Sequence, residues 1–127
     1  MDRIRYEETL GFAHDIKKLL KRFRSLRADI EVAKRYALEP FHAEPRIDTN
    51  AIEEISGSCT EEVRACKIKK FTCRAIKGRG VMSGIRITYA YHIRQKRVVF
   101  IEIYFKGDKE NEDRARIKEY LESILDA

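Results

Sequence analysis

The N-terminal part of the chain has the hydrophobic spacing of helices. After Thr9, apolar residues recur at intervals of three and four, at Phe12, Ile16, Leu19, Leu20 and Phe23. This spacing places them on one face of a helix, and Thr9 is a suitable N-cap. A second stripe follows Ser25 and consists of Leu26, Ile30, Ala33 and Ala37. The pattern predicts a helical hairpin with a very short turn, or one long helix through Leu38.

The middle of the chain changes to the period-two pattern of strands. Apolar and polar positions alternate through residues 85–93, and residues 98–105 are apolar on both faces. Together with residues 63–76, these segments predict three antiparallel strands in a meander, the last covered on both sides. The segment 77–84 has three glycines and predicts a flexible hairpin loop. A short edge strand is predicted at residues 3–6.

The remaining segments complete an α+β domain. Pro40 and Pro45 are expected to end helical structure. Residues 39–62 are predicted to be an irregular acidic connection, with or without a turn of helix at residues 49–55. Near the C-terminus, Asn111 is the expected N-cap of a last amphipathic helix. The predicted fold is a single domain, residues 1–127, in which the helical hairpin and the C-terminal helix pack on an antiparallel β-sheet.

Charge is concentrated in the predicted sheet. Residues 63–106 contain twelve Lys and Arg residues and a single acid, Glu102, so their net charge is +11 in a chain whose total is +6. A basic antiparallel sheet is the electrostatic signature of a site for a polyanion such as nucleic acid. The alternative is a solvated basic face that only keeps the protein in solution. Self-repulsion of this size is costly without an anionic partner, which favours the polyanion site.

The sequence gives little support to metal or cofactor chemistry. The three histidines fall in different predicted elements without the spacing of metal ligands: His14, His42 and His92. The three cysteines lack Cys-x-x-Cys spacing and are typical of free thiols in a reducing compartment: Cys59, Cys66 and Cys73. We therefore expect no metal and no cofactor. The chain also lacks any run of about 18 apolar residues and an N-terminal secretory signal, so we expect a cytoplasmic protein without a membrane span.

Individual cations of the predicted strands are the candidates for contacts with a polyanion. Lys67 and Lys69 are two residues apart and therefore project from one face of their strand. Arg86 and His92 share a face of the next strand. If the strands pair as a meander, one concave surface collects these side chains. Further cations expected to contact a nucleic-acid backbone are Lys70, Arg74, Lys77, Arg79, Arg94, Lys106 and Lys109.

Three short motifs also occur in a fixed order along the chain. They are Cys66-Lys67-Ile68-Lys69, Ser83-Gly84-Ile85-Arg86-Ile87-Thr88-Tyr89-Ala90-Tyr91 and Val98-Val99-Phe100-Ile101-Glu102-Ile103-Tyr104. With the order of the predicted elements, these motifs resemble the RelE/ParE superfamily of toxins from type II toxin–antitoxin systems. The resemblance covers residues 63–121 well and the N-terminal helices more loosely.

The resemblance implies a compact α+β toxin that an acidic antitoxin neutralises by wrapping around it. RelE-like members enter the ribosomal A site and cleave mRNA without a metal. In this reaction a 2′-hydroxyl attacks the adjacent phosphate, and fixed cations stabilise the extra negative charge of the transition state. A Lys, His, Tyr or Glu side chain moves the protons.

Several residues match the family's motifs. Lys67 and Lys69 match its strand lysines, which implies a role as general base or phosphate clamp. Arg86 matches the arginine that contacts the scissile phosphate. Lys106 lies where the final strand of the family delivers further cations.

The chain departs from the family after the final strand. RelE has an arginine there, whereas this chain has Gly107-Asp108, with Lys109 as the nearest cation. The catalytic tyrosine that follows in RelE has no counterpart at residues 111–113. His92 or Glu102 is then the candidate for proton transfer. Two alternatives stay open: a non-catalytic RNA- or ribosome-binding module, and a ParE-like gyrase inhibitor, which no sequence feature selects.

The acidic segment before the basic strands also allows two interpretations. Residues 39–62 carry a net charge of −6. They are either a solvated loop or a segment that folds over the basic sheet and neutralises part of its charge. The second interpretation predicts that acids such as Glu53 and Glu54 weaken RNA binding.

Overall fold

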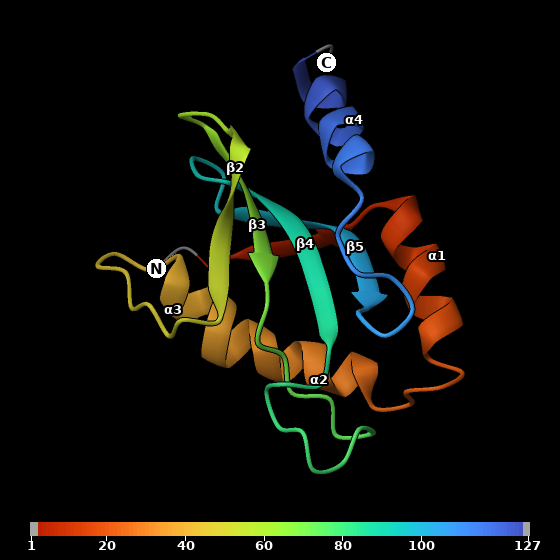
Figure 1. Cartoon of the computed structure of the whole chain (residues 1–127). Helices are drawn as coiled ribbons and strands as arrows, with labels where there is room; N and C mark the ends of the chain where they lie inside the picture. Colours follow the sequence, from red (N-terminus) through yellow and green to blue (C-terminus); the bar gives the residue numbers. More distant parts are fainter. Residues whose placement is uncertain (1–2, 126–127) are drawn as a thin grey trace.

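The computed structural model describes residues 3–125 and has a five-stranded sheet at its centre (Figure 1). The strand order is β1-β5-β4-β3-β2; β1 is parallel to β5, and every other neighbouring pair is antiparallel. The strands are β1 Arg5–Glu8, β2 Ile52–Cys59, β3 Val63–Ile68, β4 Ile85–His92 and β5 Arg97–Phe105. The predicted meander corresponds to β3-β4-β5, and the predicted edge strand to β1. Both predictions are confirmed.

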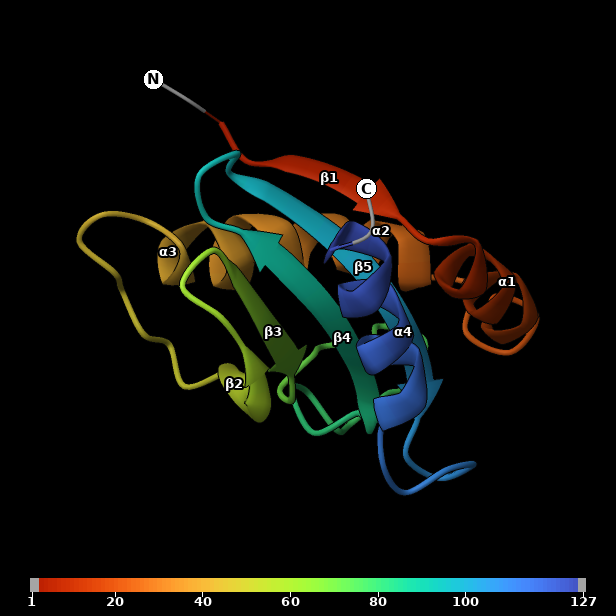
Figure 2. The same cartoon turned by 90° about the horizontal axis from the view of Figure 1, so that it is seen from above.

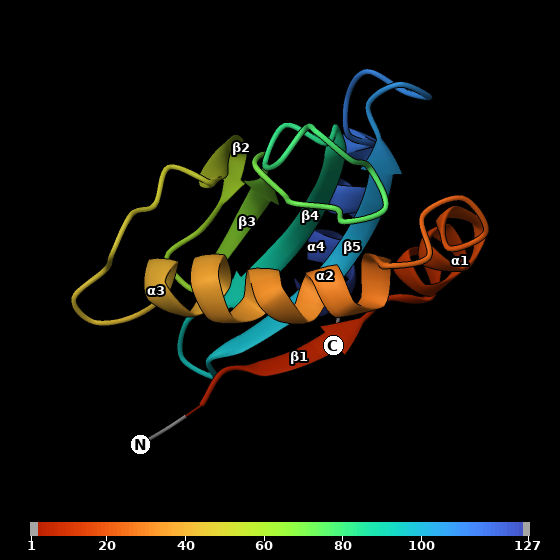
Figure 3. The same cartoon turned by 90° about the horizontal axis from the view of Figure 1, so that it is seen from below.

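Helices cover both faces of the sheet (Figures 2 and 3). On one face lie α1 (Leu10–Leu19) and a continuous helical segment formed by α2 (Leu26–Ala33), the π-helix η1 (Lys34–Leu38) and α3 (Glu39–Phe41). On the other face lies α4 (Arg114–Leu125). The two separate N-terminal helices confirm the predicted hairpin and exclude one long helix. None of the helices between residues 3 and 125 is long and apolar enough to cross a membrane.

The hydrophobic positions of the sequence form two layers of core. The larger layer lies between the sheet and the N-terminal helices, where Phe12 stacks on Phe100 with ring centroids 5.1 Å apart. The smaller layer lies under α4 and contains Ile55, Val63, Ala65, Ala90, Ile101 and Ile117. Strand β5 contributes to both layers because it is central and covered on each side, as its apolar pattern predicts.

The prediction of an irregular connection at residues 39–62 is wrong. Residues 52–59 form strand β2, and no helical turn is present at residues 49–55. The acids that suggested a solvated loop pair across the sheet: Glu53 lies opposite Lys67, and Glu54 forms an ion pair with Arg64. Ile52 and Ile55 are buried, while Gly57 has a positive φ of 82° in the irregular second half of the strand.

Pro40 does not end the helix, contrary to prediction. The helical segment runs through Phe41, and a π-helical turn directly precedes the proline. In this turn the Glu39 N–H donates to the Lys34 carbonyl, five residues back. In a π-helical turn each N–H bonds to the carbonyl five residues back instead of four. This change occurs next to Pro40, which has no N–H to donate.

Two element boundaries also differ from the predictions. The strand predicted at residues 63–76 ends at Ile68, and residues 69–84 form one long connection in which Phe71 is buried. Helix α4 begins at Arg114 rather than after Asn111. Asp113 caps it instead, because its carboxylate accepts a hydrogen bond from the Arg116 N–H at 3.1 Å.

Candidate functional site

The candidate site lies on the face of the sheet that α4 covers, at the end where β3 and β5 finish and β4 begins. Lys67 follows Val63 and Ala65 at alternate positions of β3, and both of these pack beneath α4. Arg86 lies near the start of β4, directly opposite Tyr104 of β5. Alternation along the strands therefore places Lys67 and Arg86 on one face, as expected from the sequence.

Lys67 is already paired with two carboxylates. Its Nζ lies 3.0 Å from Glu112 Oε1 and 3.6 Å from Glu53 Oε1. Lys69 Nζ lies 3.4 Å from the other oxygen of Glu53. One of these acids comes from β2 and the other from the segment that leads into α4. The interpretation in which acidic residues neutralise part of the basic sheet therefore agrees with the contacts of Glu53.

A second group of ion pairs fixes the start of α4 to the sheet. Glu102 of β5 is only 2% exposed, and it accepts a hydrogen bond from the Asp113 N–H at 2.8 Å. Lys109 Nζ forms an ion pair with the same carboxylate, and Arg116 Nη1 lies 3.7 Å from it. Lys109 and Glu102 therefore contact each other, and both hold the chain between β5 and α4.

Arg86 and Lys106 remain available to a ligand. Within residues 3–125 neither side chain forms an ion pair with a carboxylate; the Arg86 guanidinium donates to the Ile85 carbonyl oxygen at 3.3 Å. Lys106 is exposed, and its N–H donates to the Gly84 carbonyl at 2.8 Å, which holds it beside the start of β4. These two cations and Lys67 form the basic centre of the candidate site.

Tyr104 and Glu112 lie among these cations and were not anticipated as site residues. Burial raises the pKa of Tyr104 to about 12, with Glu112 and Glu102 acting in the same direction and Arg86 against them. Burial alone would raise the pKa of Glu112, but hydrogen bonds from Lys67, its own backbone and Arg114 lower it to about 2. Neither pKa is near neutrality, where a general acid or base works best.

His92 lies apart from this site. It is at the opposite end of β4 from Arg86, and six residues of strand correspond to about 20 Å. Its Nε2 is 2.7 Å from the hydroxyl of Tyr120 in α4. Burial and then Arg97 lower the pKa of His92, while Glu7 acts in the opposite direction. The expectation that His92 and Arg86 share one concave site is not met by this geometry.

The other expected RNA-contacting residues are distributed over three places. Arg94 lies in the β4–β5 turn, at the same end of the sheet as His92. Lys77 and Arg79 are exposed in the 69–84 connection. Arg74 also lies there, and its Nε is 3.3 Å from Oδ1 of the buried Asp29. Lys70, the second residue after the end of β3, lines a groove on the other face of the sheet.

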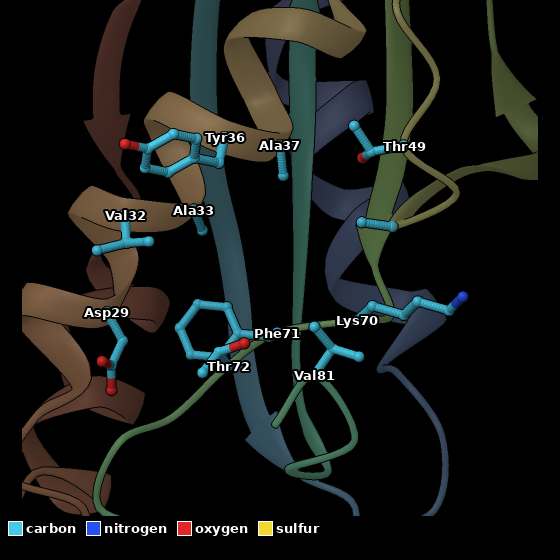
Figure 4. Close-up of a pocket in the computed structure, with 11 residues that line it drawn as sticks. Asp29, Val32, Ala33, Tyr36, Ala37, Thr49, Lys70, Phe71, Thr72 and Val81 are labelled. Carbon is cyan, nitrogen blue, oxygen red and sulfur yellow. The ribbon is translucent and has the colours of Figure 1, made fainter. Parts of the chain in front are cut away.

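This groove is an apolar concavity beside Lys70 (Figure 4). It has a volume of about 230 Å³ and lies between the α2–η1 segment and the 69–84 connection. Three apolar side chains at its walls are well exposed, Val32 at 49%, Tyr36 at 65% and Val81 at 46%. Exposed apolar side chains around a groove are typical of a surface that binds another protein.

The cysteines and histidines do not form a metal site within residues 3–125. No group of three or more His, Cys, Asp or Glu side chains there is placed to hold an ion. The three cysteines are free thiols, and burial raises the pKa of the Cys66 thiol to about 12. His42 is instead part of the core, where its Nε2 lies 2.8 Å from the hydroxyl of Tyr89.

The class defined by these features is an α+β protein with Lys67, Arg86 and Lys106 at one end of its sheet. No model of a known protein family matches the chain, and no curated protein matches its sequence. Among solved structures, a chain in the crystal structure of the archaeal RelE–RelB complex from Pyrococcus horikoshii OT3 has a similar fold. The TM-score is 0.52, with 10% identity, over 84% of this chain and 98% of that chain. The protein therefore has a RelE-like fold, which confirms the fold expected from the sequence motifs.

Proposed function

We propose that this protein is the toxin of a type II toxin–antitoxin system and acts in the cytoplasm on mRNA bound to the ribosome. The observation that supports this proposal is the position of Arg86, Lys106 and Lys67 at one end of a RelE-like sheet. Arg86 and Lys106 have no carboxylate partner within the described chain, so both are available for phosphate oxygens.

The proposed reaction is metal-independent cleavage of the RNA backbone. The 2′-hydroxyl loses its proton and attacks the neighbouring phosphate, which forms a 2′,3′-cyclic phosphate. The bond from phosphorus to the 5′-oxygen breaks, and that oxygen receives a proton, so no proton is gained or lost overall. Arg86 and Lys67 supply the fixed positive charge that stabilises the transition state. Lys67 contributes only when an RNA phosphate replaces Glu112 as its ion-pair partner. Lys69 is an additional phosphate contact, and it too must first release its carboxylate partner, Glu53.

The proposed protein partner is an acidic antitoxin. The structurally similar chain comes from a complex whose title names RelE and RelB. The chain has a net charge of +6, which favours association with an acidic protein. The apolar groove with Val32, Tyr36 and Val81 at its walls supplies exposed apolar area for such a contact.

A second candidate function is supported by the same ion pairs. Lys67, Lys69 and Lys109 already contact carboxylates, and Tyr104 and Glu112 are not poised for proton transfer at neutral pH. These observations favour an RNA- or ribosome-binding module that does not cleave. It would inhibit translation only by occupying its site.

One experiment separates the two functions. The protein is expressed from an inducible promoter, and the messages on translating ribosomes are mapped by primer extension. A toxin with nuclease activity arrests growth and leaves new 5′ ends, and Arg86→Ala removes both effects. The matched control is Arg5→Ala, which removes an exposed arginine from β1. Growth arrest without new 5′ ends excludes the nuclease, and unchanged cleavage by Arg86→Ala refutes the role of Arg86.

A further inference from the structure

Three segments that are distant in the sequence meet beside the candidate site. They are the turn between α1 and α2 (residues 20–25), the first part of the 69–84 connection, and the chain that follows β5. Figures 1 and 3 show the first two at the same end of the sheet as the end of β5. We call the surface formed by Lys21, Arg22, Arg24, Arg74, Lys77 and Lys106 the junction surface.

Direct contacts join the α1–α2 turn to the chain after β5. The rings of Phe23 and Phe105 pack with centroids 5.1 Å apart. The Arg22 guanidinium carbon lies 5.3 Å from the centre of the Phe105 ring, and Arg22 Nη1 lies 2.5 Å from Asp108 Oδ2. The turn is therefore held beside Lys106, the next residue after Phe105.

Hydrogen bonds join the same turn to the 69–84 connection. Ser25 Oγ accepts from the Ala75 N–H at 2.9 Å. Asp29, only 3% exposed, accepts from the backbone N–H of Arg74 at 3.2 Å and from its Nε at 3.3 Å. Arg24 immediately precedes Ser25, and Arg74 is itself bonded to Asp29 and immediately precedes Ala75, so these contacts bring the two arginines near each other.

The junction surface is strongly basic and has little exposed apolar area. Arg22 and Arg74 each have an aspartate partner, Asp108 and Asp29, whereas the other four cations form no ion pair within residues 3–125. None of the well-exposed large apolar side chains falls in residues 20–25, 73–79 or 105–109. A protein partner would use such side chains, as at the groove, whereas a nucleic-acid backbone needs only the cations.

We propose that the junction surface is a second binding site for the sugar–phosphate backbone of RNA, outside the reacting phosphate. Lys106 belongs to both surfaces, since its N–H is bonded to the Gly84 carbonyl beside the start of β4. An RNA chain on Arg86 therefore continues over Lys106 to Lys21 and Arg24. This inference takes its substrate class from the proposed function but does not require cleavage.

The test measures RNA affinity by fluorescence anisotropy with a labelled, unstructured RNA oligonucleotide over a series of salt concentrations. The double variant Lys21→Gln/Arg24→Gln should bind at least about 10-fold more weakly near 0.1 M salt, with a salt slope smaller by about 1.4. The matched control is Arg5→Gln/Lys96→Gln, which removes the same two charges from exposed positions at the other end of the sheet. It should keep most of the affinity and the salt slope.

Asp108→Asn provides a test in the opposite direction. It frees Arg22 and removes an acid from the junction surface, so RNA binding should become tighter by a few-fold at low salt. Equal affinities of the junction double variant and its control would overturn the inference, even if Arg86→Ala abolishes cleavage. Weaker binding by the junction variant alone supports the inference, even if no cleavage occurs. An unaltered protein that does not bind the RNA refutes the RNA-binding inference. Cleavage is decided separately, by the primer-extension experiment on translating ribosomes.

Discussion

Lys67 Nζ lies 3.0 Å from Glu112 Oε1, and this ion pair joins β3 to the segment that leads into α4. The carboxylate is nearly buried, with 7% of its side chain exposed, and Arg114 Nε also lies 2.9 Å from it. Lys67 is also one of the two strand lysines for which the sequence motif implies a role as general base or phosphate clamp. Under the proposed function, RNA would compete with Glu112 for this cation, and the strength of the ion pair would limit the affinity for RNA.

Neutralising Glu112 should strengthen RNA binding. Glu112→Gln keeps the size and one hydrogen-bonding oxygen of the side chain but removes its charge, so Lys67 loses its nearer carboxylate partner and keeps only the more distant Glu53. We expect about five-fold tighter binding near 0.1 M salt and a salt slope larger by about 0.7. Anisotropy titrations of labelled RNA at several salt concentrations measure both quantities.

The control for this prediction removes the same charge from elsewhere on α4. Glu119 is exposed and forms no ion pair within residues 3–125, so Glu119→Gln changes net charge without releasing a cation. It should change the affinity much less than Glu112→Gln. If both variants tighten binding equally, the gain comes from overall charge, and the competition between RNA and Glu112 is disproved.

Glu53 should oppose RNA binding in the same way but more weakly. It lies between Lys67 and Lys69, at 3.6 and 3.4 Å, and its side chain is 47% exposed. Exposed ion pairs contribute little because solvent screens them, so we expect Glu53→Gln to tighten binding by about two-fold. The same titration checks this, with Glu61→Gln in the β2–β3 turn as control. Weaker binding by Glu53→Gln would contradict the prediction.

The protein should become less stable in mild acid, because His42 takes up a proton in the unfolded chain and not in the folded protein. Burial and then Arg46 lower the pKa of His42 from 6.5 to about 3. The unfolded chain therefore takes up a proton below pH 6.5 that the folded protein does not take up until near pH 3. The stability that neutral His42 contributes to the folded protein is therefore fully present above pH 6.5 and is lost as the pH falls toward 3. From pH 7 to pH 5, the free energy of unfolding should decrease by about 2 kcal/mol.

Urea unfolding at several pH values measures this effect. In His42→Gln, the amide can still bond to the Tyr89 hydroxyl but does not titrate, so the decrease between pH 7 and pH 5 should become smaller. His92, whose pKa is also lowered, accounts for a residual decrease. An unchanged pH dependence in His42→Gln would show that another group causes the acid sensitivity.

The elements that could be predicted are those whose hydrophobic pattern can be recognised within the element itself. The alternation along β4 and the two-sided apolar pattern of β5 gave both strands and their faces. Strand β2 could not be recognised in this way because its charged residues find their partners on β3, and the pairing is a property of the sheet. The cap of α4 was misplaced because Asn111 and Asp113 are equally suitable by residue type.

The candidate site was predictable only in part. The spacing of two between Lys67 and Lys69 was enough to put them on the same side of the chain, although Lys69 lies just beyond the end of β3. Their neutralisation was not predictable from local pattern, because Glu112 lies 45 residues away from Lys67. Tyr104 was missed because β5 is apolar on both faces, and its sequence pattern does not distinguish a site residue from a core residue. The distance between Arg86 and His92 could have been inferred, since six residues of strand separate them.

Removing the carboxylate of Asp29 should loosen the 69–84 connection. This buried group accepts hydrogen bonds from Ser25 Oγ at 2.6 Å and from the backbone and side chain of Arg74. Asp29→Ala should lower the free energy of unfolding by about 2 kcal/mol, because it removes charge-assisted hydrogen bonds at a buried position. Hydrogen exchange at the Ala75 amide should become faster, and RNA binding weaker, because Asp29 then no longer holds Arg74 and Ser25 together. Glu31→Ala, at an exposed position of the same helix, should cost less than about 1 kcal/mol and leave exchange at Ala75 unchanged. Equal effects of the two substitutions would show that Asp29 does not hold the connection in place.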